Sequence, residues 1–155
     1  IIVVVITIML NEKYNQYSLI LDQTARRVKQ YAQTAFTENK FDITVDQWTA
    51  LRTIFERPNM TNKELAEICG KDQPTSTRII DLLIKKGLVE RIVHKTDRRC
   101  LQLKTTAKGE QKVQEIAPKV AEFRMQAWQN LDEQDFKHFS RILNTIYNNL
   151  ITNSK

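Results

Sequence analysis

Apolar residues recur every three or four positions over most of the chain, a spacing typical of amphipathic helices. One such stripe extends from Tyr17 to about Phe36. A second begins after Thr44, a residue that commonly caps helix N-termini, and ends before Pro58. Two longer stripes, after Thr106 and from about residue 136 to 151, predict a pair of C-terminal helices.

The middle of the chain shows sharper start and stop signals for two short helices. Thr61 with Glu64 three residues later predicts a capping box, and Gly70 ends the helix that follows. Asp72 then caps another helix, which ends at Gly87. Two short helices with a tight turn between them form a helix-turn-helix.

The apolar period changes from about 3.6 to 2 after this pair of helices. Val89, Arg91 and Val93 alternate with Glu90 and Ile92, residues 101–104 alternate between apolar and polar side chains, and the stretch HKTDRR joins the two segments. We therefore expect a β-hairpin directly after the helix-turn-helix. The predicted fold is mainly α with a small β-hairpin wing, that is, a winged helix-turn-helix lobe with N- and C-terminal dimerisation helices.

The second helix of the pair is the candidate recognition helix. Ala66 is small enough to lie where the two helices cross, and Gly70 permits the turn. The outward face of the second helix has polar side chains that can bond to base edges or phosphates. The residues predicted there are Gln73, Thr75, Thr77 and Arg78.

Positive charge is concentrated in the same region. The chain has a net charge of +6, and eleven Lys and Arg against six Asp and Glu lie between residues 63 and 108, which gives this stretch +5 of that charge. A polyanionic partner would explain the concentration. A solvated basic face is the alternative that composition leaves open.

The combination of helices and hairpin resembles the MarR (multiple antibiotic resistance regulator) family of winged-helix transcription factors, over about residues 17–150. The matching segments are Thr77-Arg78-Ile79, Leu82-Leu83, Lys86 to Arg91, Asp97-Arg98-Arg99, Leu101, Leu103, and Thr106 to Gly109. The resemblance implies a homodimer that binds a pseudo-palindromic operator in double-stranded DNA, most simply as a repressor.

The resemblance also implies roles for the hairpin tip. Arg99 would enter the minor groove, whose negative potential attracts arginine. Asp97 would pair with it or with a neighbour, and Arg98 and Lys95 would face phosphates. The alternative is a solvated wing.

The domain boundaries follow from these elements. Residues 44–108 form the DNA-binding lobe, and residues 17–43 and 109–155 form the dimerisation helices. Residues 1–16 are an N-terminal extension, in which we expect Met9 to be the natural start and residues 1–8 not to be native. The last helix has an apolar stripe suited to a dimer interface, made of Phe136, Phe139, Leu143, Ile146 and Leu150.

In the family, small aromatic or phenolic effectors bind between the lobe and the dimerisation helices. The resemblance assigns Tyr31, Phe36, Trp48 and Arg52 to such a pocket. The alternative is that Trp48 belongs to the core. A ligand bound in this pocket would release a repressor from its operator.

Other classes of function lack their sequence signals. No phosphate-binding loop, zinc-protease motif or nucleophile elbow is present, so we expect neither an enzyme nor a cofactor or metal site. Cys69 and Cys100 are too few for a disulfide framework, which favours the cytoplasm, and Cys100 beside cations is a weak redox candidate. The apolar opening is too short to span a membrane. A winged helix that binds a protein or RNA remains the alternative function.

Overall fold

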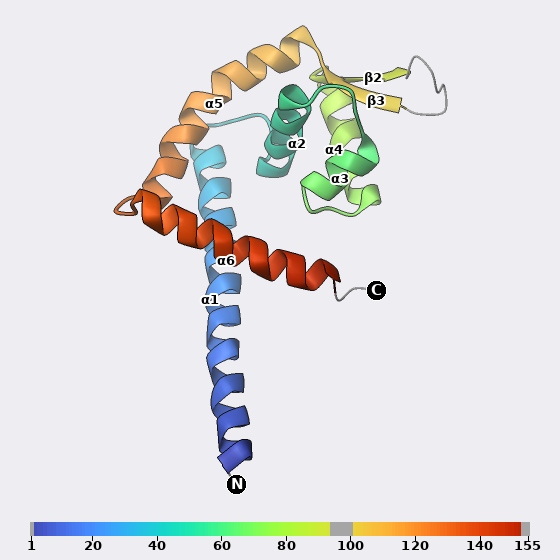
Figure 1. The fold of residues 1–155 in the computed structure, drawn as a ribbon. Coiled ribbons are helices and arrows are strands. Elements are labelled where there is room, and N and C mark those ends of the chain that lie inside the picture. The colour runs from blue at the N-terminus through green and yellow to red at the C-terminus, as the bar shows by residue number, and fades with distance from the viewer. Residues whose placement is uncertain (1, 94–100, 153–155) are drawn as a thin grey trace. The chain divides into compact units, whose positions relative to one another are not determined.

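The computed structural model describes residues 2–93 and 101–152. It divides into two compact units, Ile1–Phe123 and Arg124–Lys155, which we treat separately. The elements are α1 (Ile2–Glu38), α2 (Val45–Glu56), β1 (Met60–Thr61), α3 (Asn62–Ile68), α4 (Gln73–Lys85), β2 (Val89–Val93), β3 (Leu101–Thr105), α5 (Ala107–Ala127) and α6 (Glu133–Thr152) (Figure 1). The fold is mainly helical with a small antiparallel sheet, as predicted.

Helix α1 is longer than predicted. It begins at Ile2 and not near Tyr17, and it reaches Glu38 as one helix of 37 residues. Residues 2–8 are all β-branched and show no helical period, so the pattern gave no signal there. No Pro or Gly interrupts the segment, and the helix continues through it.

The predicted caps set the N-termini of the short helices. Thr44 and Gln47 form a reciprocal capping box at α2, as do Thr61 and Glu64 at α3. The backbone N–H of Thr61 donates to the Glu64 carboxylate at 2.7 Å, and this bond holds the pKa of Glu64 below its usual range. These side chains bond amide groups that a helix start leaves without partners.

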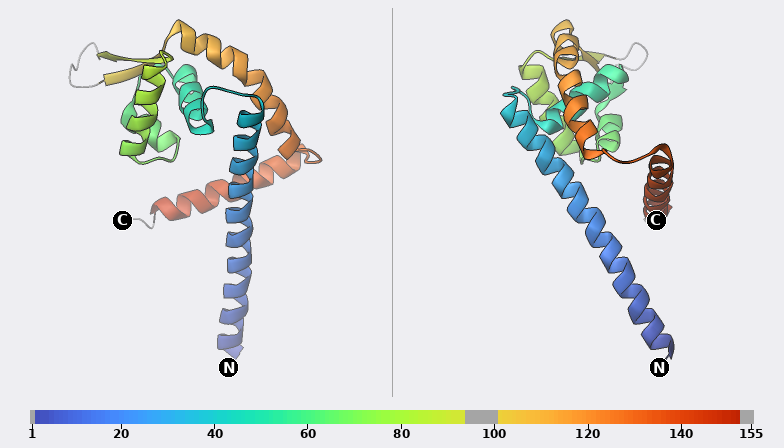
Figure 2. Two further views of the ribbon diagram at one scale, coloured as in Figure 1. Left: turned by 180° about the vertical axis from the view of Figure 1, so that it is seen from behind. Right: turned by 90° about the vertical axis from the view of Figure 1, so that its left-hand side faces the viewer.

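The core of the first unit lies between α2, α3, α4, the sheet and α5, and Figure 2 shows α2, α3 and α4 grouped beside the sheet in both views. Its largest fully buried side chains are Trp48, Leu51, Ile54, Leu65, Ile80, Leu83, Leu88, Leu103 and Ile116. Helix α1 contributes Ala35 and Phe36. Trp48 is therefore a core residue.

The sheet has the order β1-β3-β2. Strands β2 and β3 pair in register from Val89 opposite Thr105 to Val93 opposite Leu101, which confirms the predicted hairpin arms. Strand β1 was not predicted. It is only two residues long and is defined by its pairing with β3, where Met60 lies opposite Leu103.

A tight joint connects the lobe to α5. The N–H of Thr106 donates to the carbonyl of Leu88 at 3.1 Å, and its hydroxyl donates to the carbonyl of Gly87 at 2.7 Å. A Cβ on Gly109 would lie 2.0 Å from the Leu88 oxygen, so only glycine fits this approach. The start of α5 is thus fixed against the turn that ends α4.

In the second unit, α6 has most of its apolar residues exposed. Phe136 and Phe139 at its start contact the ring of Trp128, at centroid distances of 5.7 and 5.3 Å. Further along, Ile146 and Ile151 are 39% and 56% exposed.

Candidate nucleic-acid interface

Helices α3 and α4 pack through small and aliphatic side chains. Ala66 is 2% exposed where the helices meet, and Ile80 and Leu83 bury the inner face of α4. Gly70 makes the turn with φ of +60°, a conformation that side chains disfavour. The N–H of Lys71 donates to the carbonyl of Ala66 at 2.9 Å and closes the end of α3.

The start of α4 is capped by Asp72. Its carboxylate accepts bonds from the backbone N–H of Thr75 at 2.7 Å and from the Thr75 hydroxyl at 2.9 Å. The bond from the backbone N–H, followed by that from the hydroxyl, lowers the pKa of Asp72. The cap fixes the end of the helix that, in a helix-turn-helix, contacts base edges.

The four predicted recognition-helix residues differ in exposure and in hydrogen bonding. Gln73, Thr75 and Arg78 are exposed, although the Thr75 hydroxyl is bonded to the cap. Thr77 is half-buried, and its hydroxyl accepts a bond from the Nδ2 of Asn62 at 2.7 Å. Asn62 was not predicted, because its partners lie fourteen and fifteen residues along the chain and no sequence pattern marks such a contact.

The hairpin extends from the lobe beside α4 (Figure 1). An ion pair between Arg91 Nη2 on β2 and Asp81 Oδ1 on α4, at 2.7 Å, connects the two elements. Both side chains are at least a third exposed, so solvent screens the pair. The predicted tip residues, Lys95, Asp97, Arg98 and Arg99, lie outside the described residues.

Residues 43–101 match the MarR family, a span that contains α2 to α4 and β2 and ends at the first residue of β3. The winged-helix lobe is of the MarR family. Proteins of this family are regulators of transcription and not enzymes.

Solved structures show the same fold over most of the chain. A MarR/EmrR family transcriptional regulator from Acinetobacter sp. ADP1 is 18% identical, with a TM-score of 0.81 over 89% of this chain and 96% of that chain. The transcriptional regulator PA3341 is 26% identical, with a TM-score of 0.76 over 88% of this chain and 98% of that chain. MepR from S. aureus, solved as a DNA complex, is 21% identical, with a TM-score of 0.74 over 86% and 97% of the two chains.

The four residues assigned to an effector pocket have different surroundings in the structure. Trp48 is buried in the core, Arg52 pairs with Glu56 on the surface of α2 at 2.7 Å, and Tyr31 packs edge-on against Phe123. The indole of Trp48 is part of the hydrophobic core, and the guanidinium of Arg52 is paired with the carboxylate of Glu56 one helical turn away.

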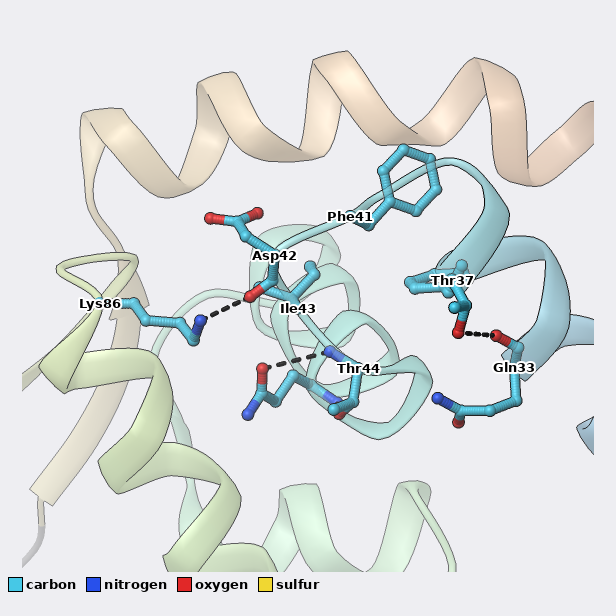
Figure 3. A pocket seen from close by; sticks show the side chains of 9 residues that line it. Gln33, Thr37, Phe41, Asp42, Ile43, Thr44 and Lys86 are labelled. Atoms are coloured by element: carbon cyan, nitrogen blue, oxygen red, sulfur yellow. Dashed lines mark hydrogen bonds between the residues drawn. The ribbon is translucent and has the colours of Figure 1, made fainter.

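A different pocket of about 300 Å³ adjoins the lobe, and of those four residues only Phe36 lines it (Figure 3). Its lining combines two aromatic rings with amide, hydroxyl and charged groups: Gln33, Phe36, Thr37, Phe41, Asp42, Ile43, Thr44, Gln47 and Lys86.

Lysines connect this pocket to the helices around it. The ammonium of Lys86, at the end of α4, donates to the carbonyl of Asp42. The Asp42 carboxylate pairs with Lys112 of α5 at 3.3 Å. Burial alone would raise the pKa of Asp42. The hydrogen bond and charge of Lys112, together with a backbone hydrogen bond and the charge of Lys86, outweigh it, and the pKa lies below its usual range.

The remaining candidates are the two cysteines, a membrane-spanning helix and a metal site. Cys69 is partly buried, and burial raises the pKa of its thiol, which makes the reactive thiolate scarcer. Cys100 lies outside the described residues. Over residues 2–93 and 101–152, no helix has both the length and the apolar character needed to cross a membrane. The same stretches hold no cluster of three potential metal ligands.

Proposed function

We propose that this protein is a homodimeric, sequence-specific regulator of transcription that inserts α4 into the major groove and the hairpin tip into the minor groove. The observation that carries the proposal is the capped helix α4, which exposes Gln73 and Arg78 beside the strands of the hairpin. The sequence that joins these strands has three cations. Gln and Arg can each make paired bonds to base edges. The concentrated positive charge supplies the attraction to phosphates.

We infer a dimer from the apolar stripe of α6. Its apolar stripe includes the exposed Phe139, Ile146 and Leu150 and the half-buried Phe136 and Leu143. A second copy would cover this stripe through a twofold axis, because a self-complementary interface needs only one kind of surface. Two lobes related by that axis would meet successive major grooves, so we expect a pseudo-palindromic operator with half-sites about one helical turn apart.

We further propose that the regulator is a cytoplasmic repressor released by a small aromatic or phenolic ligand. The pocket in Figure 3 supports this, since the rings of Phe36 and Phe41 offer apolar contact and Lys86 offers a cation. Lys86 also follows the last residue of α4. A ligand that drew its ammonium from the carbonyl of Asp42 would loosen the end of the recognition helix.

The proposal is tested by duplex binding with Arg99→Ala and the matched variant Arg52→Ala, which removes the same charge from α2. The duplexes are those that the wild-type protein selects from a random pool. We expect Arg99→Ala to weaken binding by about 1–3 kcal/mol and Arg52→Ala to leave it nearly unchanged. The logarithm of wild-type affinity should fall linearly with the logarithm of salt concentration.

Binding that is indifferent to salt, or confined to RNA or a protein partner, would contradict the proposal and favour the alternative winged-helix function. Equal affinity of Arg99→Ala and wild type at matched salt would remove the hairpin tip from the mechanism.

A further inference from the structure

A single side-chain amide connects α3 to two adjacent hydroxyl groups of the recognition helix. Asn62 is the first residue of α3. Its Oδ1 accepts from the hydroxyl of Ser76 and its Nδ2 donates to the hydroxyl of Thr77, each at 2.7 Å. Ser76 is 3% exposed, and both bonds are at least partly buried. Partly buried bonds of this length are well made and costly to break.

Proton counting shows that this contact requires an amide. The one hydroxyl proton of Thr77 goes to the carbonyl of Gln73, at 2.9 Å. The Thr77 oxygen can therefore only accept from Asn62, which must present its NH₂ group. The amide oxygen then remains for the Ser76 proton, as observed. An aspartate would lack the donor, and an aliphatic residue would lack both partners.

Two contact points on adjacent residues fix more than distance. Ser76 and Thr77 are separated by about 100° around the helix axis, so a rigid planar amide bonded to both resists rotation of α4 about its own axis. Side-chain tips lie about 5–6 Å from a helix axis, and a rotation of about 10° would move them by about 1 Å. A shift of that size is enough to break a base-edge hydrogen bond.

We infer that Asn62 is a positioning residue that sets the rotation of α4, and that the Thr77 hydroxyl serves this contact and does not read a base. The inference rests on the proposed DNA-binding function and extends it to the regulation of base choice. Gln73 and Arg78 are exposed on the same helix, and their orientation toward the base edges would depend on Asn62.

The test is selection of bound duplexes from a random pool with Asn62→Asp and Thr77→Val, near-isosteric changes that remove the donor and the acceptor of one bond. Asn59→Asp is the matched control, since it adds the same charge at an exposed position three residues earlier. Thr77→Ser keeps the hydroxyl and is the rescue. Thermal unfolding followed by circular dichroism identifies a temperature at which every variant is fully folded. Selection at that temperature separates a loss of specificity from a loss of stability.

A protein that reads base edges directly binds a site with one wrong base pair about 5- to 150-fold more weakly than its preferred site. We expect Asn62→Asp and Thr77→Val each to reduce that ratio by about threefold or more at the positions α4 contacts, and their combination to add little, because both remove one bond. Asn59→Asp and Thr77→Ser should keep the wild-type preference.

The outcomes separate the two claims. A wild-type protein that selects no sequence would overturn the proposed function and this inference with it. A wild-type motif that persists unchanged in folded Asn62→Asp would overturn the inference alone. Loss of preference in Thr77→Val without loss in Asn62→Asp would also overturn it, by showing that Thr77 reads a base directly.

Discussion

Helices α4 and α6 both place apolar residues along one face, yet those faces have different surroundings. On α4, Ile80 and Leu83 are fully buried beneath α2, α3 and the sheet. On α6, Phe139 is 43% exposed and Ile146 is 39% exposed. The same sequence pattern thus belongs to a buried core at α4 and to an exposed apolar surface at α6. Amphipathic periodicity predicts that a face will be covered without stating which chain covers it.

The largest expected effect is at the uncovered face. Leu143→Asp would place an unpaired charge in the proposed dimer interface and should raise the free energy of association by about 4 kcal/mol. Asn144→Asp, one residue along on an exposed position, is the control and should leave the dimer intact. Sedimentation across a concentration series measures both. Equal dimer affinity in the two variants would show that α6 is not the interface.

The covered face should respond within one chain. Leu83→Ala leaves a cavity beneath α4 and should cost about 2–5 kcal/mol of unfolding free energy in urea. The neighbouring Leu82 is 39% exposed, and Leu82→Ala should cost about 1 kcal/mol or less. A similar loss in both would mean that the inner face of α4 is not packed as described.

The short helices of the lobe were predictable because neighbouring residues in the sequence determine where each one begins. Thr44, Thr61 and Asp72 each precede a helix and each cap it through a bond to a residue three positions on. The start of α1 was missed because a run of β-branched residues has no period that distinguishes helix from strand.

The site was predictable in part for a similar reason. Exposure of Gln73 and Arg78 follows from helical periodicity about the buried Ile80 and Leu83. The contact of Asn62 with Thr77 crosses fifteen residues and depends on how α3 meets α4, which no local pattern encodes.

A smaller effect concerns the joint that connects the covered region to α5. Gly109→Ala would bring a Cβ to 2.0 Å from the Leu88 carbonyl oxygen and should destabilise the lobe by about 2 kcal/mol. Gly70→Ala is the comparison, since that site has open space and only its φ of +60° opposes a side chain, at a cost of about 1 kcal/mol. Thermal unfolding ranks the two. The reverse order would show that the joint yields easily.

The smallest effect is a pH dependence at the start of α4. Because the folded state lowers the pKa of Asp72, its contribution to stability is complete above the pKa of the unfolded chain and is lost as the pH falls through the folded value. Asp72→Asn keeps a capping oxygen without titrating. The stability difference between wild type and Asp72→Asn should therefore shift against the wild type as the pH drops from 7 to about 3. A difference that is constant with pH would show that the cap does not depend on the carboxylate.

The central claim is that the uncovered face of α6 joins two lobes on one operator. Light scattering of the complex with a selected duplex, at micromolar protein, measures the number of chains bound. Two chains per duplex are predicted, together with loss of this stoichiometry in Leu143→Asp. One chain per duplex, bound with the affinity of the full operator, would contradict the account.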